Sequence, residues 1–411
     1  MLEKKTNKDE NKGKHKENFD HKKIRLISFI SFLMGFSQAV LLYVMSSYFK
    51  LASGMENVGI FYAASYSIFL VILLNLHKAV RTLGKANVFY FSLLFKIIAI
   101  VFLIFAAPGK LGILLLAAYI ILGHIEWVAL DTIIENFSAD AMSGRIRGLH
   151  LTIINAGFLL GPFISTRVLD TVGFHGIFAF SLVINALVFV FALVGFRQSN
   201  HRFEPRLKAR EVIMKALKRK NIMRAYYISF VLEFFYALMV IYTPIYLRDL
   251  GYSWEDVGKM FTVMLVPFVL VQYPMGVLAD KKFGEKEFLI GSLLLMAVST
   301  MAVYFIGLGS VAVWAAMLFL TRLGAALIEI LRDSYFYKRI DGRDVDLINF
   351  FRTTVPVAYI FAAIFSSLLL VFAPVKFAFI LVGAVVFSAL IPAFALEDNR
   401  CEKELANRGK A

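Results

Sequence analysis

Cysteine is nearly absent from this chain, since Cys401 is the only one among 411 residues. It stands in a polar segment near the end, so the sequence offers neither a disulfide framework nor a cysteine metal site. No Gly-x-x-x-x-Gly-Lys-Ser/Thr loop occurs, which argues against work driven by ATP. The polar, lysine-rich start also lacks the apolar region and cleavage site of a signal peptide. We expect no cofactor and no metal, and we expect the first apolar helix to serve as the insertion signal.

Acidic residues are scarce beside basic ones: 29 Asp and Glu stand against 44 Lys and Arg, and the net charge is +15. Most basic residues lie in both tails and in alternate segments between apolar runs. The positive-inside rule makes these segments cytoplasmic. The charge therefore indicates topology rather than nucleic-acid binding, and no nucleic-acid partner is expected. It predicts a multi-pass protein of the cytoplasmic (plasma) membrane with both termini inside.

Apolar residues are abundant: 59% of the chain is hydrophobic, and the mean hydropathy is +0.72. Apolar runs long enough to cross a lipid bilayer recur between Ile24 and Leu396. The predicted fold is therefore an all-α membrane protein with about twelve transmembrane helices. Their expected ranges are about 24–48, 58–76, 87–107, 111–135, 148–169, 174–196, 225–247, 257–279, 287–308, 311–333, 349–372 and 376–396.

Composition divides the chain into five segments. Residues 24–196 and 225–396 are each expected to form a six-helix bundle. Between them, residues 197–224 form a basic cytoplasmic linker. Residues 1–23 and 397–411 are cytoplasmic tails, and the first of them is low enough in apolar residues to be disordered.

The two bundles are expected to be pseudo-symmetric, because a charged pattern in the fourth predicted helix returns in the tenth. A shift of about 198 residues superposes the two copies. The matched positions are His124 with Arg322, Asp131 with Glu329, Glu135 with Asp333, and Gly144-Arg145 with Gly342-Arg343. Positions seven and eleven residues apart share one helix face, so each copy places a midspan base above two acids. A duplicated charged membrane helix predicts a transporter whose site lies between the halves.

The segment between the eighth and ninth predicted helices reads GVLADKKFGEKE. Glycine suits a tight turn, and Asp280 can accept hydrogen bonds from helix N-termini or pair with an arginine. This segment resembles the signature loop of the major facilitator superfamily at Gly276, Asp280, Lys281, Gly284 and Lys286. It departs from that loop by one extra residue before Gly284 and by Glu285, where a base is common.

Two further features extend the resemblance. Gly157, Gly161 and Pro162 resemble the family's fifth-helix Gly-x-x-x-Gly-Pro, without the paired glycines that follow in many antiporters. Glu135 and Arg147-Gly148 are similar to the acid and the Arg-Gly pair that flank the family's loop between helices 4 and 5. Together with the duplication and the helix count, the resemblance covers nearly the whole chain.

The resemblance implies a secondary active transporter rather than an enzyme. Two bundles would rock about a central site lined by helices 1, 4, 7 and 10, and Asp280 would join a cytoplasmic ion-pair network. We expect a small solute, coupling to protons and a monomer. Two alternatives stay open: a membrane-embedded enzyme acting on a lipid or lipid-linked substrate, and a non-transporting scaffold or sensor. The scaffold predicts that function survives the loss of Arg322.

Polar residues near the middle of the first four predicted helices are the first site candidates. Lys96 and Glu126 each lie about 13 Å from the inner ends of their helices. In one interpretation, Lys96 and Glu126 form a structural ion pair. In the other, Glu126 takes part in proton coupling. His124 either titrates near neutrality or packs as a polar histidine. Gln38 is a further candidate in the first helix.

Arg322 and Glu233 lie at similar depth in the tenth and seventh predicted helices. They either pair with each other or face the cavity as a substrate anchor and a proton site. We favour a cavity role for Arg322, since an intramembrane arginine is functional by default. It favours a solute with an anionic group, whereas the many apolar cavity candidates favour a hydrophobic one.

Acids four residues apart stand near the inner ends of the fourth and tenth helices, Asp131 with Glu135 and Glu329 with Asp333. One interpretation is a cytoplasmic gate in which these acids pair with arginines. The candidate arginines are Arg145, Arg147, Arg332 and Arg343. The other interpretation is that one acid of each like-charged pair carries a proton.

Overall fold

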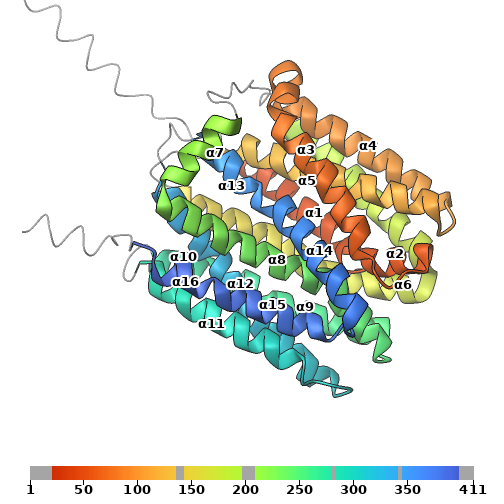
Figure 1. Ribbon diagram of the computed structural model, residues 1–411. Coiled ribbons are helices and arrows are strands. Elements are labelled where there is room, and N and C mark those ends of the chain that lie inside the picture. Colours follow the sequence, from red (N-terminus) through yellow and green to blue (C-terminus); the bar gives the residue numbers. More distant parts are fainter. Residues whose placement is uncertain (1–20, 136–142, 197–208, 280–283, 341–344, 398–411) are drawn as a thin grey trace, which may run out of the picture.

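The computed structural model describes residues 21–135, 143–196, 209–279, 284–340 and 345–397. Within these ranges the chain forms helices and no strands, so the predicted all-α fold is confirmed (Figure 1). Before the linker, the helices are α1 (His21–Leu42), α2 (Met45–Ser53), α3 (Gly59–Leu83), α4 (Lys85–Phe105), α5 (Lys110–Glu135) and α6 (Ser143–Gly195). After it come α7 (Ala209–Lys218), α8 (Lys220–Asp249), α9 (Trp254–Leu270), α10 (Gln272–Leu278), α11 (Lys286–Val303), α12 (Val311–Lys338), α13 (Val345–Arg352), α14 (Thr354–Phe372), α15 (Phe377–Ser388) and α16 (Leu390–Phe394).

Eleven stretches of the described chain are long and apolar enough to cross a membrane. One of them, Leu151–Gly195, has 45 residues, which is about twice the length that a bilayer needs. Gly173 interrupts it with φ 75° and ψ −165°, a conformation that only glycine adopts readily. This stretch therefore supplies two antiparallel spans, and the described helices account for the expected twelve.

Three predicted spanning helices are each broken in two. The first pieces, α9, α13 and α15, end four residues before Pro274, Pro356 and Pro392, respectively. Proline has no N–H to donate to the carbonyl four residues earlier, and its ring clashes with that carbonyl. The structure therefore has the expected spans at 257–279, 349–372 and 376–396, but each is interrupted at these points, and these interruptions were not predicted from the sequence. The first predicted helix is also divided, at Tyr43 and Val44 between α1 and α2.

The helices form two groups that lie side by side in Figure 1. In the first group α1 packs against α6 and α4 against α5; in the second α12 packs against α9 and α11. The groups meet where α6 contacts α9 and α10, where α3 contacts α14, and where α2 contacts α8. A Cβ added to Gly157 would lie 2.2 Å from the carbonyl oxygen of Phe32. The fifth-helix glycine motif thus lets α6 pack directly onto α1.

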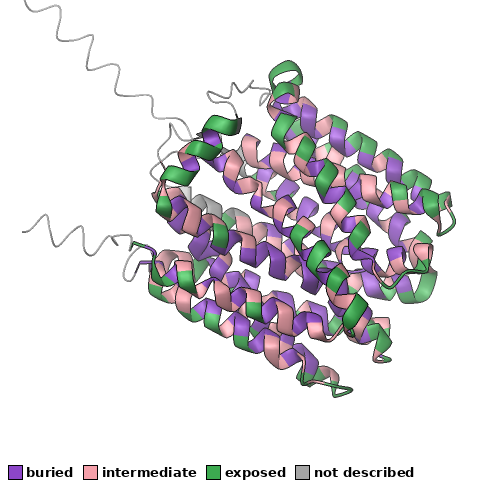
Figure 2. Ribbon diagram, viewed as in Figure 1, coloured by how far each residue is buried: buried purple, intermediate pink, exposed green. Residues whose placement is uncertain are grey.

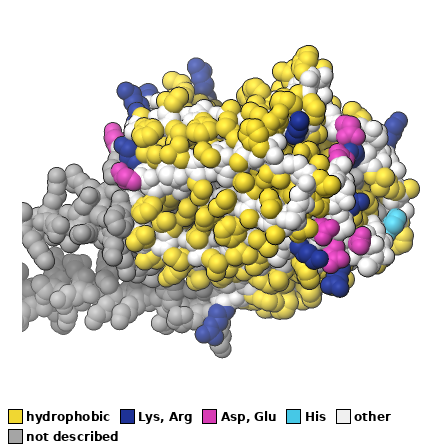
Figure 3. Space-filling view, turned by 90° about the horizontal axis from the view of Figure 1, so that it is seen from below, with side chains coloured by type: hydrophobic (Ala, Val, Ile, Leu, Met, Phe, Trp, Pro, Cys, Tyr) yellow, Lys and Arg dark blue, Asp and Glu magenta, His cyan; other side chains and the backbone are white. Residues whose placement is uncertain are grey.

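Buried residues lie mostly where the helices face one another, and exposed residues lie on the outer faces (Figure 2). Large exposed side chains there include Phe102, Phe105 and Val371. Figure 3 shows hydrophobic side chains covering one side of the molecule, with charged side chains mostly near its ends. A surface of this kind matches the hydrocarbon core of a bilayer.

Candidate functional site

Arg322 is a buried cation on α12, with 2% of its surface exposed. Its guanidinium carbon lies 4.9 Å from the ring centroid of Phe235 and 5.5 Å from that of Tyr236, both on α8. No carboxylate of the described residues forms an ion pair with Arg322, and its Nε makes no hydrogen bond. Aromatic faces stabilise a cation, but they leave its charge uncompensated.

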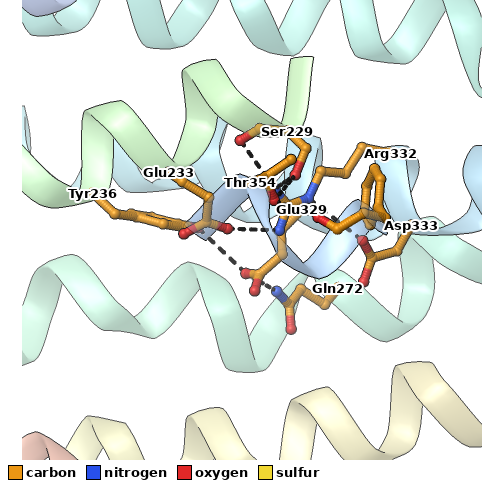
Figure 4. A network of polar contacts seen from close by, with 9 residues as sticks. Ser229, Glu233, Tyr236, Gln272, Glu329, Arg332, Asp333 and Thr354 are labelled. Carbon is orange, nitrogen blue, oxygen red and sulfur yellow. Dashed lines mark hydrogen bonds and ion pairs between the residues drawn. The ribbon is translucent and has the colours of Figure 1, made fainter. Parts of the chain in front are cut away.

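Arg332 lies about three turns further along α12 and, unlike Arg322 among the described residues, forms ion pairs with acidic side chains. It lies 2.9 Å from Glu233 Oε1 and 3.4 Å from Asp333 Oδ1 (Figure 4). It also donates to Ser229 Oγ at 2.5 Å, and that hydroxyl donates to Thr354. Of the two alternatives for Glu233 and Arg322, the structure does not show the pairing with each other, because Glu233 binds Arg332. Asp333 thus pairs with Arg332, one of the four candidate arginines of the gate interpretation.

Glu329 lies between these two arginines on α12 and is the acid with neutral hydrogen-bond partners. Its Oε2 accepts a hydrogen bond from Tyr236 Oη at 3.3 Å and another from Gln272 Nε2 at 2.9 Å (Figure 4). No basic side chain of the described chain lies at ion-pair distance from it. Tyr236 thus contacts both Arg322 through its ring and Glu329 through its hydroxyl.

Gln272 continues this chain of contacts into the first group of helices. Its Oε1 accepts a hydrogen bond from Asn155 Nδ2 of α6 at 2.9 Å, while its Nε2 donates to Glu329. Gln272 is fully buried at the start of α10. Our sequence reasoning gave Asn155 and Tyr236 no role. An amide within an otherwise apolar spanning helix was the only sequence signal for Asn155.

In the first group of helices, Lys96 and Glu126 form the expected ion pair between α4 and α5. Both side chains are buried, and Glu126 Oε1 has no hydrogen-bond partner. His124 is 2.7 Å from Tyr66 Oη, and its ring packs against Phe69. These contacts are those of a polar packing histidine.

A small cavity lies between the two groups, with room for little more than a water molecule. Its walls include Gln38, Tyr62, His124 and Lys96 from the first group and Tyr359 of α14 from the second. Tyrosines and aliphatic side chains make up most of the lining, and Lys96 is already neutralised by its carboxylate partner. Gln38 also accepts a hydrogen bond from the indole of Trp127. Two of the site candidates, Gln38 and His124, therefore line this cavity.

Ion pairs join the two groups at both ends of the molecule. Asp131 of α5 lies 3.7 Å from Arg352 of α13, at the end that carries the linker. At the opposite end, Lys50 of α2 lies 3.1 Å from Asp249 of α8 and 2.9 Å from Glu56. Asp131 therefore pairs with an arginine outside the expected set. The opposite-end pair was missed, because its members are separated by almost 200 residues.

Part of the expected cytoplasmic network lies outside the described residues. This holds for Asp280, Lys281 and Arg343, and for the side chains of Glu135, Arg145 and Arg147. The rest of the signature loop is described: Gly284 has φ 74°, the left-handed backbone that favours glycine. Gly276 faces Ile330, which a Cβ would approach to 3.3 Å, and Lys286 begins α11.

Comparison with known proteins agrees with this architecture. A sequence model of the Major Facilitator Superfamily matches residues 124–265 and 255–410. Among curated proteins, none matches the chain. Among solved structures, the chain is similar to the human organic anion transporter MFSD10 (TETRAN), with a TM-score of 0.68 and 14% sequence identity. The match covers 90% of this chain and 98% of that one, and at this identity it shows the fold alone.

Proposed function

Because this chain belongs to the major facilitator superfamily, we propose that it is a secondary active transporter of the cytoplasmic membrane. It moves a small solute with an anionic group by alternating access, and the movement is coupled to protons. The observation that carries the proposal is Arg322, a buried guanidinium without a carboxylate partner among the described residues.

An anionic solute would supply the charge that Arg322 lacks. A charge at membrane depth costs free energy unless it has a partner, so such a residue is retained for a function. The rings of Phe235 and Tyr236 hold the guanidinium in place without neutralising it. The structural neighbour is described as an organic anion transporter. That description agrees with the proposed anionic solute, but the proposal rests on the environment of Arg322 in this chain.

The proton site is assigned to Glu329 by the charges around it. Three carboxylates, Glu233, Glu329 and Asp333, stand with two guanidiniums in this cluster, which leaves one negative charge in excess. Glu233 and Asp333 each have Arg332 as a partner. Glu329 has a phenol and an amide instead, so protonating Glu329 removes the excess charge without breaking an ion pair.

Alternating access requires that the contacts at the two ends break in turn. The Lys50–Asp249 pair closes one end, and the Asp131–Arg352 pair bridges the other. Each pair is partly exposed, so each contributes little to stability and can break at small cost. The small cavity lies between the two helix groups that these pairs join.

The proposal is tested with purified protein in liposomes that carry a pH-sensitive dye. Pools of organic acids, sugars, peptides and hydrophobic cations are added in turn. We expect organic acids to move protons, Arg322→Ala to abolish the response, and Glu329→Gln to retain anion binding without proton movement. Arg167→Ala, which removes an exposed arginine of α6, is the matched control and should respond as the wild type does. An unchanged response in Arg322→Ala would refute the anchor.

A further inference from the structure

A chain of buried polar contacts connects Glu329 with the interface between the two helix groups. Glu329 accepts from the amide nitrogen of Gln272 at 2.9 Å, and the amide oxygen of Gln272 accepts from Asn155 at 2.9 Å. Glu329 and Gln272 belong to the second group, and Asn155 belongs to the first. A single amide therefore links a titratable carboxyl to a contact that must break when the groups separate.

We propose that Gln272 and Asn155 form a relay that reports the protonation state of Glu329 to the interface. This inference rests on the proton site assigned above, and it adds two positioning residues that contact neither Arg322 nor the cavity. Gln272 lies six residues before the end of α10, at Leu278, and thus in the half of the membrane that carries the linker. The relay therefore affects the contact between the two helix groups in the half of the membrane that carries the linker.

The direction of the effect follows from hydrogen-bond chemistry. An ionised Glu329 only accepts, so it fixes the Gln272 amide with its nitrogen inward and its oxygen toward Asn155. This bond is charge-assisted and about twice as strong as a neutral one. A protonated Glu329 loses that assistance, and its new O–H favours the turned amide, whose oxygen faces Glu329 instead of Asn155. Protonation therefore weakens the contact and favours separation of the groups on the linker side.

The groups that act on the charge of Glu329 come from two helices. On α12 they are Arg332 and Asp333, and on α8 they are Glu233 and the phenol of Tyr236. The partner from α10, Gln272, is neutral, as is Asn155 of α6. Arg332 is already bound to Glu233 and Asp333, so it stays charged and in place while Glu329 titrates. The change is therefore confined to the bond with Gln272 and the phenol.

The test measures distances between spin labels in purified full-length protein, in which Cys401→Ser removes the native thiol. One label pair replaces the exposed residues Leu149 and Glu287, near the linker-side ends of α6 and α11. A second pair, at Leu51 and Leu308, reports the opposite end. Distance distributions are recorded at pH 5 and pH 8 without added solute.

For the linker-side pair of the wild type, we expect the separated population to rise by about fivefold at the lower pH. Gln272→Leu and Asn155→Leu should abolish this pH response and show the separated population at both pH values, as should Glu329→Gln. Thr166→Val is the matched control: Thr166 of α6 also faces the second group, at Gly258, but contacts no carboxyl. It should keep the wild-type response.

A wild-type pH response in Gln272→Leu, or a wild type whose label distances do not change with pH, would overturn the relay. Elution as a single species and an unchanged melting temperature establish that each variant is folded. Benzoate binding is measured on the same samples and reports on the anion site alone. A relay that responds to pH in protein that binds no organic acid would leave the inference standing and refute the proposed solute class.

Discussion

Removing one member of the Lys96–Glu126 pair should destabilise the protein strongly, whereas removing both should not. The two side chains are 5% and 1% exposed and lie at the middle of their spans. A lone lysine at the centre of a membrane helix costs about 3 kcal/mol on insertion scales. Breaking a buried pair costs roughly 3–5 kcal/mol, while replacing both members by neutral residues is often nearly neutral.

The measurement is the free energy of unfolding in mixed detergent micelles for Lys96→Met, Glu126→Gln and the double variant. We expect each single change to lower it by about 3 kcal/mol and the double change by clearly less than the sum. Lys110→Met, which removes an exposed lysine at the start of α5, should have little effect. Additive single effects would refute a structural pair. Loss of proton movement in a well-folded double variant would instead assign Glu126 to coupling.

Two further predictions concern packing and the linker-side contact. Gly157→Ala should cost about 1–3 kcal/mol, because the added Cβ would lie 2.2 Å from the carbonyl oxygen of Phe32. Gly123→Ala, with nothing within 4 Å of the added atom, should be neutral or raise stability by up to about 1 kcal/mol, because alanine has the higher helix propensity. Equal melting temperatures of the two variants would contradict the reasoning. Asp131→Asn should change stability by less than about 1 kcal/mol, since the 3.7 Å pair with Arg352 is half-exposed. It should raise the labelling of cysteines at the linker-side ends, and unchanged labelling would count against this contact.

The spans could be predicted from the sequence because each one must be apolar over the thickness of a bilayer. The breaks before Pro274, Pro356 and Pro392 also have a local cause in the sequence, since proline removes the hydrogen bond to the carbonyl four residues earlier. They were missed because the spans were assigned from hydropathy, which does not record whether a residue has a backbone N–H. The boundary between the predicted spans at 148–169 and 174–196 is confirmed, since Gly173 carries the reversal between them.

The partner of Glu233 could not be predicted, because it depends on how far α8 is shifted along α12. Two arginines, Arg322 and Arg332, stand about 15 Å apart along α12, and either can meet an acid on α8. The sequence gives the depth of each residue only to within a turn or two. The contact of Asn155 with Gln272 joins residues 117 positions apart across the interface, so no local pattern encodes it.

The two copies of the charged helix pattern have different surroundings in the structure. His124 occupies the place that Arg322 holds in the second copy, yet His124 has Tyr66 as a hydrogen-bond partner and Phe69 as a packing partner. In the first group the midspan charges, Lys96 and Glu126, cancel each other. In the second group Arg322 and Glu329, which form no ion pair among the described residues, stand on one helix, joined through Tyr236. Under the proposed function, a solute and a proton bound there would change the charge of one group only. Their free energy of binding would then act on the interface between the groups, which is where alternating access would require it.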